Sequence, residues 1–279
     1  MEKAVNQENT RARFEAIAKG KDEDIHLDEA ALVIASETDE SVDVTTSLKM
    51  LDNLAHRFET SFGGDLSFGV SVTRLIDFIH KEEGFGGNVR DYYDPVNSYL
   101  NRVIEVKIGI PITLAIIHIA LGQRLEVPVT GVNFPGHFLV KYGNENRLLV
   151  DPFAGRVLSE PDCGTLLKQI AGPKASLRSH YFDTATNKDI LIRVLDNLKQ
   201  IFWRDKLWEE SRKCIERQQL LKPQQDEYTV QLGAVYEMQG NLSLAQFTYA
   251  NIVQQSEDQQ TRDLASKRLL ALSANPTVH

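Results

Sequence analysis

Apolar residues recur every three or four positions through the first third of the chain. The pattern runs through three stretches: "LDEAALVIASETD", "DVTTSLKMLDNLAHRFETSF" and "SVTRLIDFIHKEEGF". Side chains at this spacing share one face of a helix, and that face is buried in a soluble domain. The pattern therefore predicts that residues 1–88 form a helical N-terminal region packed on a core.

The middle of the chain predicts two more helices. One runs from about Val96 to Val106. The other begins near Pro111. Proline suits the first turn of a helix, because an N–H group there has no intrahelical partner and proline has no N–H. The stretch "IGIPITLAIIHIALG" is apolar on every side but only about fifteen residues long, whereas a membrane span needs about 20. We expect a buried helix here and no membrane-spanning segment.

Three short apolar runs follow the buried helix: "VTGVNF", "HFLVKYG" and "RLLVDPF". Turn-forming residues, Pro-Gly among them, separate the runs. They predict an antiparallel meander that packs on the buried helix. Residues 89–185 are thus expected to form an α+β core.

Beyond Ile190 the pattern is again purely helical, and it matches itself after a shift of 34 residues. The matched pairs are Leu198 with Leu232, Phe202 with Tyr236, Ser211 with Ala245, and Ile215 with Tyr249. Small and aromatic residues at these positions are typical of tetratricopeptide repeats. Residues 186–279 are predicted to form two repeats and a capping helix. Because about three repeats are needed for independent stability, we expect them to lean on the core.

Composition and charge exclude several classes of protein. The net charge is −8 and the basic residues form no run, which argues against nucleic-acid binding. Cys163 and Cys214, the two cysteines, make neither a disulfide framework nor a thiolate zinc site. The polar N-terminus has no signal-peptide core, so a cytoplasmic location is expected. Neither clustered metal ligands nor a phosphate-binding or dinucleotide motif occurs, and we expect no metal and no cofactor.

His137 and Asp151 are the first candidate site residues. His137 follows Pro135-Gly136 at the predicted start of one strand, and Asp151 ends the next strand. Adjacent antiparallel strands bring such residues within reach, so the carboxylate could orient the imidazole as in a catalytic triad. The alternative is a structural hydrogen bond that holds the meander together.

A nucleophile that completes this pair is expected at the N-terminus of the buried helix, where the helix dipole lowers the pKa of a thiol. Pro111 occupies this position and has no nucleophilic group. Thr113 is more typical of an ordinary first-turn residue. Cys163, near the start of a later helix, is the alternative nucleophile, although a lone cysteine is usually a packing residue. His118 is expected to be a hydrogen-bonded interior histidine.

The stretch "GNVRDYYDPVNSYLN" offers candidate binding residues. Tyr93, Asn97 and Ser98 precede the first core helix and could line the same cleft as His137 and Asp151. Asp94-Pro95 is also a helix-start signal, so helix capping is the simpler interpretation of this stretch.

Two long stretches carry a family resemblance: "DYYDPVNSYLNRVIEVKIGIPITLAIIHIALGQRLEVPVTGVNFPGHFLVKY" and "LLVDPFAGRVLS". They resemble bacterial SirB-type proteins, which join a transglutaminase-like core to tetratricopeptide repeats. The resemblance covers most of the chain, from about Leu27 to Leu272. It implies a papain-like α+β core and a cytoplasmic location.

The resemblance also assigns site positions. Active transglutaminase-like enzymes carry Gly-x-Cys at the start of the core helix, an alanine four residues after the cysteine, then a histidine and an aspartate on successive strands. On this chain, these positions are Gly109, Ala115, His137 and Asp151, and the cysteine position is Pro111. The resemblance therefore implies a degenerate triad that lacks its nucleophile.

The leading functional hypothesis is a non-catalytic transglutaminase-like protein. Its cleft, formed by Tyr93, Asn97, Ser98, His137 and Asp151, would bind a protein or peptide, and the repeats would add a second surface. The alternative is a cysteine-dependent amide hydrolase or acyltransferase that uses Cys163 with His137 and Asp151. A third possibility is that the repeats alone bind partners. The sequence leaves the partner and the oligomeric state open.

Overall fold

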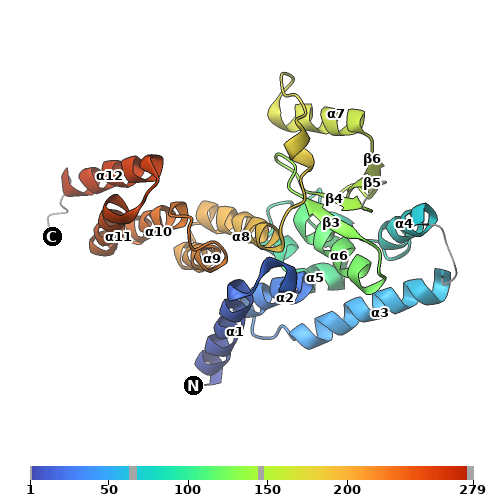
Figure 1. Ribbon diagram of the computed structural model, residues 1–279. Helices are drawn as coiled ribbons and strands as arrows, with labels where there is room; N and C mark the ends of the chain where they lie inside the picture. The colour runs from blue at the N-terminus through green and yellow to red at the C-terminus, as the bar shows by residue number, and fades with distance from the viewer. Residues whose placement is uncertain (1, 63–67, 144–147, 275–279) are drawn as a thin grey trace. The chain divides into compact units, whose positions relative to one another are not determined.

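The computed structural model describes residues 2–62, 68–143 and 148–274. The chain divides into two compact units, Met1–Val194 and Leu195–His279. The boundary falls within one helix, α8 (Asn187–Arg204). Each unit is mostly helical, and the described strands all belong to the first unit (Figure 1).

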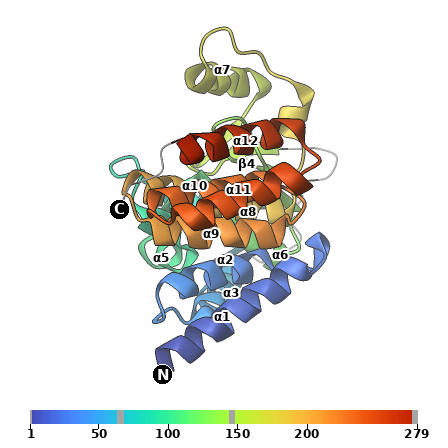
Figure 2. The same ribbon diagram turned by 90° about the vertical axis from the view of Figure 1, so that its left-hand side faces the viewer.

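The first unit begins with four α-helices: α1 (Glu2–Lys19), α2 (Leu27–Thr38), α3 (Val44–Phe62) and α4 (Phe68–Asp77). The sequence predicts a helical region here, and its three periodic stretches fall on α2, α3 and α4. Helix α2 contacts both α1 and α3 (all three in blue in Figure 2). Helix α4 continues into a π-helical turn, Phe78–Glu82.

The next predicted helix is shorter than expected. Pro95–Ser98 form a 3₁₀ turn, and helix α5 (Leu100–Val106) begins only after Tyr99. The carboxylate of Asp94 caps this turn by accepting the N–H of Val96. Tyr99 then takes an extended conformation, with φ −93° and ψ 111°. The prediction of one helix from Val96 was wrong because the Asp-Pro start signal belongs to a separate turn.

Helix α6 (Pro111–Arg124) is the buried helix that the sequence predicts. Every residue from Pro111 to Gly122 is buried. Its start is stabilised by Thr113, whose hydroxyl accepts the N–H of Ile110 at 3.1 Å and donates to the carbonyl of Asn97 at 2.8 Å. At its other end, Arg124 pairs with Asp28 of α2 and Asp52 of α3.

The three predicted strands are present: β3 (Val129–Val132), β4 (Leu139–Tyr142) and β5 (Leu148–Asp151). A fourth strand, β6 (Arg156–Leu158), extends this antiparallel sheet, whose order is β3-β4-β5-β6. Because β6 has only three residues and is partly exposed, its sequence carried no strand signal. A separate parallel pair joins β1 (Gly86–Gly87) to β2 (Ile108–Gly109).

Both faces of the central strand β4 are buried. Tyr142 faces α6, where its hydroxyl meets His118. Leu139 faces the opposite way and packs in a cluster with Cys163 and Leu167 of α7 (Glu160–Ala171). Side chains alternate across a strand, so the sheet is covered by α6 on one face and by α7 with its neighbouring segments on the other.

The second unit contains the end of α8 and four further helices: α9 (Trp208–Leu221), α10 (Glu227–Met238), α11 (Leu242–Gln255) and α12 (Gln259–Ala274). From α9 onwards, each helix packs on the next. Helix α11 begins and ends 34 residues after α9. Gly233 lies so close to Tyr249 that an added Cβ would be 2.6 Å from its ring.

The contact between α6 and the sheet gives a test of the fold. A Cβ at Gly122 would lie 2.4 Å from Val129 Cγ2 and 2.8 Å from the carbonyl of Val127. We predict that Gly122→Ala lowers the free energy of unfolding by about 2 kcal/mol, because overpacking forces the backbone to move. Urea denaturation measures the change.

Gly164→Ala in α7 is the matched control. Its added Cβ would make only an ordinary 3.6 Å contact with Leu177. Alanine is the better helix former, so this variant should be as stable as the wild type or slightly more stable. Equal losses in the two variants would contradict the close packing of α6 on β3.

Candidate functional site

The structure brings His137 and Asp151 together. His137 lies in the turn after Gly136, whose φ is +67°, and its N–H donates to the carbonyl of Phe134. The imidazole Nε2 donates to Asp151 Oδ1 at 2.9 Å. The pair is mostly buried, with side-chain exposures of 13% and 7%. The prediction that His137 starts a strand was wrong. Strand β4 begins two residues later, at Leu139.

The carboxylate of Asp151 is held by more than His137. Its Oδ1 also accepts the backbone N–H groups of Phe153 at 2.9 Å and Ala154 at 3.2 Å. Burial raises the pKa of Asp151, but the hydrogen bond and charge of His137 and the two N–H donors outweigh it, so the pKa lies below its ordinary value. The carboxylate is therefore ionised at neutral pH and fixes the orientation of His137.

Aromatic rings lead from this pair to the surface. The Phe153 ring lies 6.4 Å from the imidazole of His137, and Tyr92 lies 6.0 Å from Phe153. Tyr93 follows at 5.3 Å and is 58% exposed. We call Phe153, Tyr92 and Tyr93 the aromatic row. It offers apolar ring surface beside an oriented imidazole.

The structure places Asn97 and Ser98 in the interior. The amide of Asn97 donates to the carbonyls of Asp91 and Tyr92, and its oxygen accepts from Asn88. This amide therefore braces the loop that carries the tyrosines of the aromatic row. Ser98 is 2% exposed, and among the described residues its hydroxyl has no partner. A binding role for either residue stays a prediction.

Cys163 is packed in the apolar cluster between the sheet and α7, with no exposed surface. Burial raises the pKa of its thiol, which opposes formation of the thiolate. Within the described ranges, no hydrogen bond joins its sulfur to His137, whose Nε2 is bonded to Asp151. These properties are those of a packing residue and argue against a nucleophile.

A second group of polar side chains lies close to Asp151. His80 Nδ1 is 2.8 Å from the carbonyl oxygen of Phe85, and its Nε2 is 2.9 Å from His118 Nε2. His118 Nδ1 is 2.5 Å from the hydroxyl of Tyr142. We call His80, His118 and Tyr142 the histidine chain. His118 is thus a hydrogen-bonded interior residue, as expected. His80 was not predicted, because it lies on the π-helical turn and outside any sequence motif.

The histidine chain has one hydrogen-bond direction when both rings are neutral. A carbonyl only accepts, so His80 carries its proton on Nδ1 and accepts at Nε2. His118 must then donate from Nε2 and accept at Nδ1, where the Tyr142 hydroxyl donates. Burial lowers the pKa of His80 and places that of His118 well below its ordinary value. The chain is therefore fully satisfied without charge.

Comparisons with known proteins agree with this architecture. A model of the transglutaminase-like superfamily matches residues 45–196, which contain α6, the sheet and the His137–Asp151 pair. The chain belongs to the transglutaminase-like superfamily. Its matched segment covers both the candidate pair and the histidine chain.

Bacterial UPF0162 proteins are similar along most of this transglutaminase-like chain. One from Xylella fastidiosa is 30% identical, over 81% of this chain and 83% of its own length. Another, from Pseudomonas aeruginosa, is 35% identical over 63% of this chain and 64% of its own length. The mouse protein F-box only protein 21 is 29% identical over 50% of this chain but only 23% of its own length. No solved structure matches significantly.

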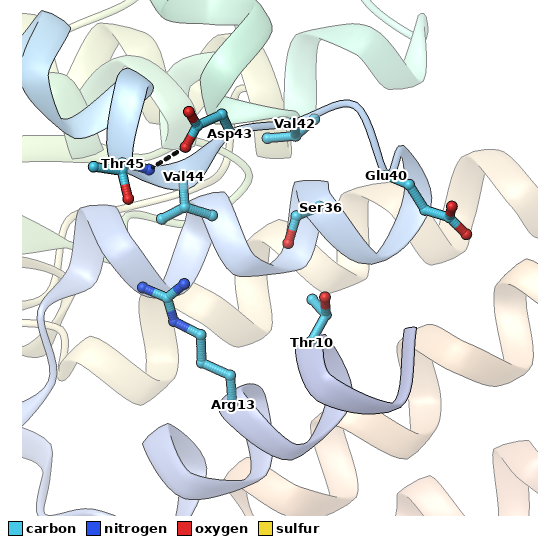
Figure 3. A pocket seen from close by; sticks show the side chains of 8 residues that line it. All are labelled: Thr10, Arg13, Ser36, Glu40, Val42, Asp43, Val44 and Thr45. Carbon is cyan, nitrogen blue, oxygen red and sulfur yellow. Dashed lines mark hydrogen bonds between the residues drawn. The ribbon is translucent and has the colours of Figure 1, made fainter. Parts of the chain in front are cut away.

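The described residues contain no group of three or more His, Cys, Asp or Glu side chains placed to hold a metal ion. None of their helices combines the length and hydropathy that crossing a bilayer requires. A polar pocket of about 200 Å³ is lined by Thr10, Arg13, Ser36 and Asp43 (Figure 3). Asp43 accepts the N–H of Thr45 at the start of α3, so its carboxylate stabilises that helix.

The histidine chain predicts how stability depends on pH. Both rings have folded pKa values below the unfolded value of about 6.5. Above pH 6.5 these rings are unprotonated in both the folded and the unfolded state, so they do not change the free energy of unfolding. Below it, the unfolded chain takes up protons that the folded protein does not, so the free energy of unfolding should fall by up to about 1.4 kcal/mol per pH unit for each ring.

Urea denaturation between pH 7 and pH 5 measures this slope. Asp151 does not interfere, because a carboxylate with a lowered pKa loses its contribution only near and below about pH 4. His80→Gln removes one of the two titrating groups and should reduce the slope by about half. A stability that is flat from pH 7 to pH 5 would show that the rings are not held neutral.

Proposed function

We propose that this protein is a non-catalytic, SirB-type member of the transglutaminase-like superfamily that binds a protein or peptide segment at His137 and Asp151. The observation that carries the proposal is that the oriented His–Asp pair is present while Pro111 begins the core helix. The proposal includes a cytoplasmic location, which the buried, unpaired cysteines fit.

Chemistry at the site supports binding over catalysis. Pro111 offers no nucleophile, and the hydroxyl of Thr113 is fully buried and occupied by backbone partners. What remains is a fixed imidazole, an ionised carboxylate and the aromatic row. Aromatic side chains with a polar neighbour suit the apolar side chains and polar backbone of a peptide.

We propose that the helices of the second unit are tetratricopeptide repeats that form a second recognition surface. The shared 34-residue offset of α9 and α11 supports this assignment. So does the full burial of the matched residues Ser211 and Ala245, where helices approach closely. A groove of about 560 Å³ lies in this unit, lined by Trp203 of α8, Ile215 of α9 and Gln231 of α10, among others.

Affinity capture from a bacterial lysate with full-length variants tests the proposal. His137→Ala should reduce recovery of a partner bound at the His137–Asp151 pair by at least about tenfold, since a buried polar contact of about 1.4 kcal/mol or more is lost. Trp203→Ala should reduce recovery of a partner held by the groove. The matched control is Leu270→Ala, which removes a 69% exposed apolar side chain of α12.

The outcomes separate the hypotheses. A partner lost with His137→Ala and retained with Leu270→Ala supports binding at the His137–Asp151 pair. Partners lost only with Trp203→Ala would assign recognition to the repeats and leave the core as a scaffold. Recovery unchanged in both variants would refute both surfaces.

A further inference from the structure

The turn that follows Asp151 packs directly against His80. The N–H of Gly155 donates to the carbonyl of Asp151 at 2.8 Å and closes this turn. Gly155 has φ +65°, and a Cβ there would lie 2.7 Å from His80 Cγ and 2.8 Å from its Nδ1. Gly155, at the end of the turn formed by residues 151–155, therefore packs directly on the imidazole of His80.

The same turn supplies most of the hydrogen bonds to the carboxylate. Phe153 and Ala154 provide two of the three donors to Asp151 Oδ1, and His137 provides the third. A displacement of the turn would move both backbone donors and the carboxylate together. The orientation of His137 consequently depends on where the turn rests.

His80 itself has little freedom to move. Both ring nitrogens are hydrogen-bonded, one to the Phe85 carbonyl and one to His118, which Tyr142 holds from the far side. Its backbone belongs to a π-helical turn, a rare conformation that frequently marks functional sites. The carboxylate of Asp151 is also close enough for its charge to act on the ring.

We propose that His80 is a positioning residue for the His137–Asp151 pair, and that the histidine chain fixes its ring for this purpose. His80 acts through the Asp151–Gly155 turn and makes no hydrogen bond to Asp151 or His137 in the described part of the chain. The inference rests on the proposed function, because it assigns the support of that same binding site.

The hydrogen-bonded N–H proton of His137 provides a direct readout. A proton donated to a carboxylate resonates far downfield and exchanges slowly, so NMR of the full-length protein with ¹⁵N-labelled histidine reports the bond without any ligand. In the wild type we expect this downfield resonance. His80→Ala and Gly155→Ala should each abolish it or shift it upfield while the protein remains folded.

Two controls separate positioning from a general loss of stability. Gly172→Ala introduces the same kind of backbone strain, at φ +93°, with no atom within 4 Å of the new Cβ, and should leave the resonance unchanged. Gly122→Ala lowers stability at the contact of α6 with β3 and should also leave it unchanged. Loss of the resonance in either control would contradict a specific role for His80.

Two results would overturn the proposal. The first is an unchanged His137 resonance in folded His80→Ala or Gly155→Ala. If His80→Ala does not fold, Tyr142→Phe removes only the hydroxyl that anchors His118, and a shift of both the His80 and His137 signals is expected. A shift confined to His118 would then be the second contradicting result. Capture experiments in which His137→Ala has no effect would refute the proposed binding role and leave this positioning result intact.

Discussion

The structure of the first unit depends on the burial of α6. Its sequence is apolar on all sides, so it is stable only where protein covers every face. The sheet covers one side of α6, and helices α2, α3 and α5 contact its other sides. Gly122 permits the close approach of β3, and Arg124 ties the end of the helix to α2 and α3.

A helix buried in this way must also satisfy its polar groups without water. Thr113 does so at its start by bonding to the backbone of Ile110 and Asn97. His118 does so at mid-length through His80 and Tyr142. These two solutions link α6 to the aromatic row, through Asn97, and to the Asp151–Gly155 turn, through His80. The candidate site is thus supported from the core helix on two sides.

Much of this architecture was predictable from the sequence. Apolar periodicity located α2, α3, α4, the buried helix and three of the four strands of the antiparallel sheet, because each pattern repeats over several residues. The His137–Asp151 pairing followed from two residues flanking adjacent strands. In contrast, β6 is too short to carry a pattern, and the break at Tyr99 depends on local backbone conformation.

The histidine chain could not be predicted, because it joins residues 38 positions apart on α6 and on a π-helical turn. No spacing rule connects such residues. The same limit applies to Cys163, whose place in the cluster between the sheet and α7 reflects tertiary packing. Side chains that flank strands are thus predictable from the sequence, whereas the side chains that hold them in place are not.

The central claim is that Pro111 occupies the position from which a nucleophile would act with His137. The most direct measurement is the rate of alkylation of Pro111→Cys by iodoacetamide at pH 6, where an ordinary thiol is almost entirely protonated. Both native cysteines are present in the two proteins compared, so their contribution to alkylation cancels in the comparison. The account predicts that Pro111→Cys reacts at least about tenfold faster than the double variant Pro111→Cys/His137→Ala, because the imidazole stabilises the thiolate. Equal rates in the two proteins would contradict it.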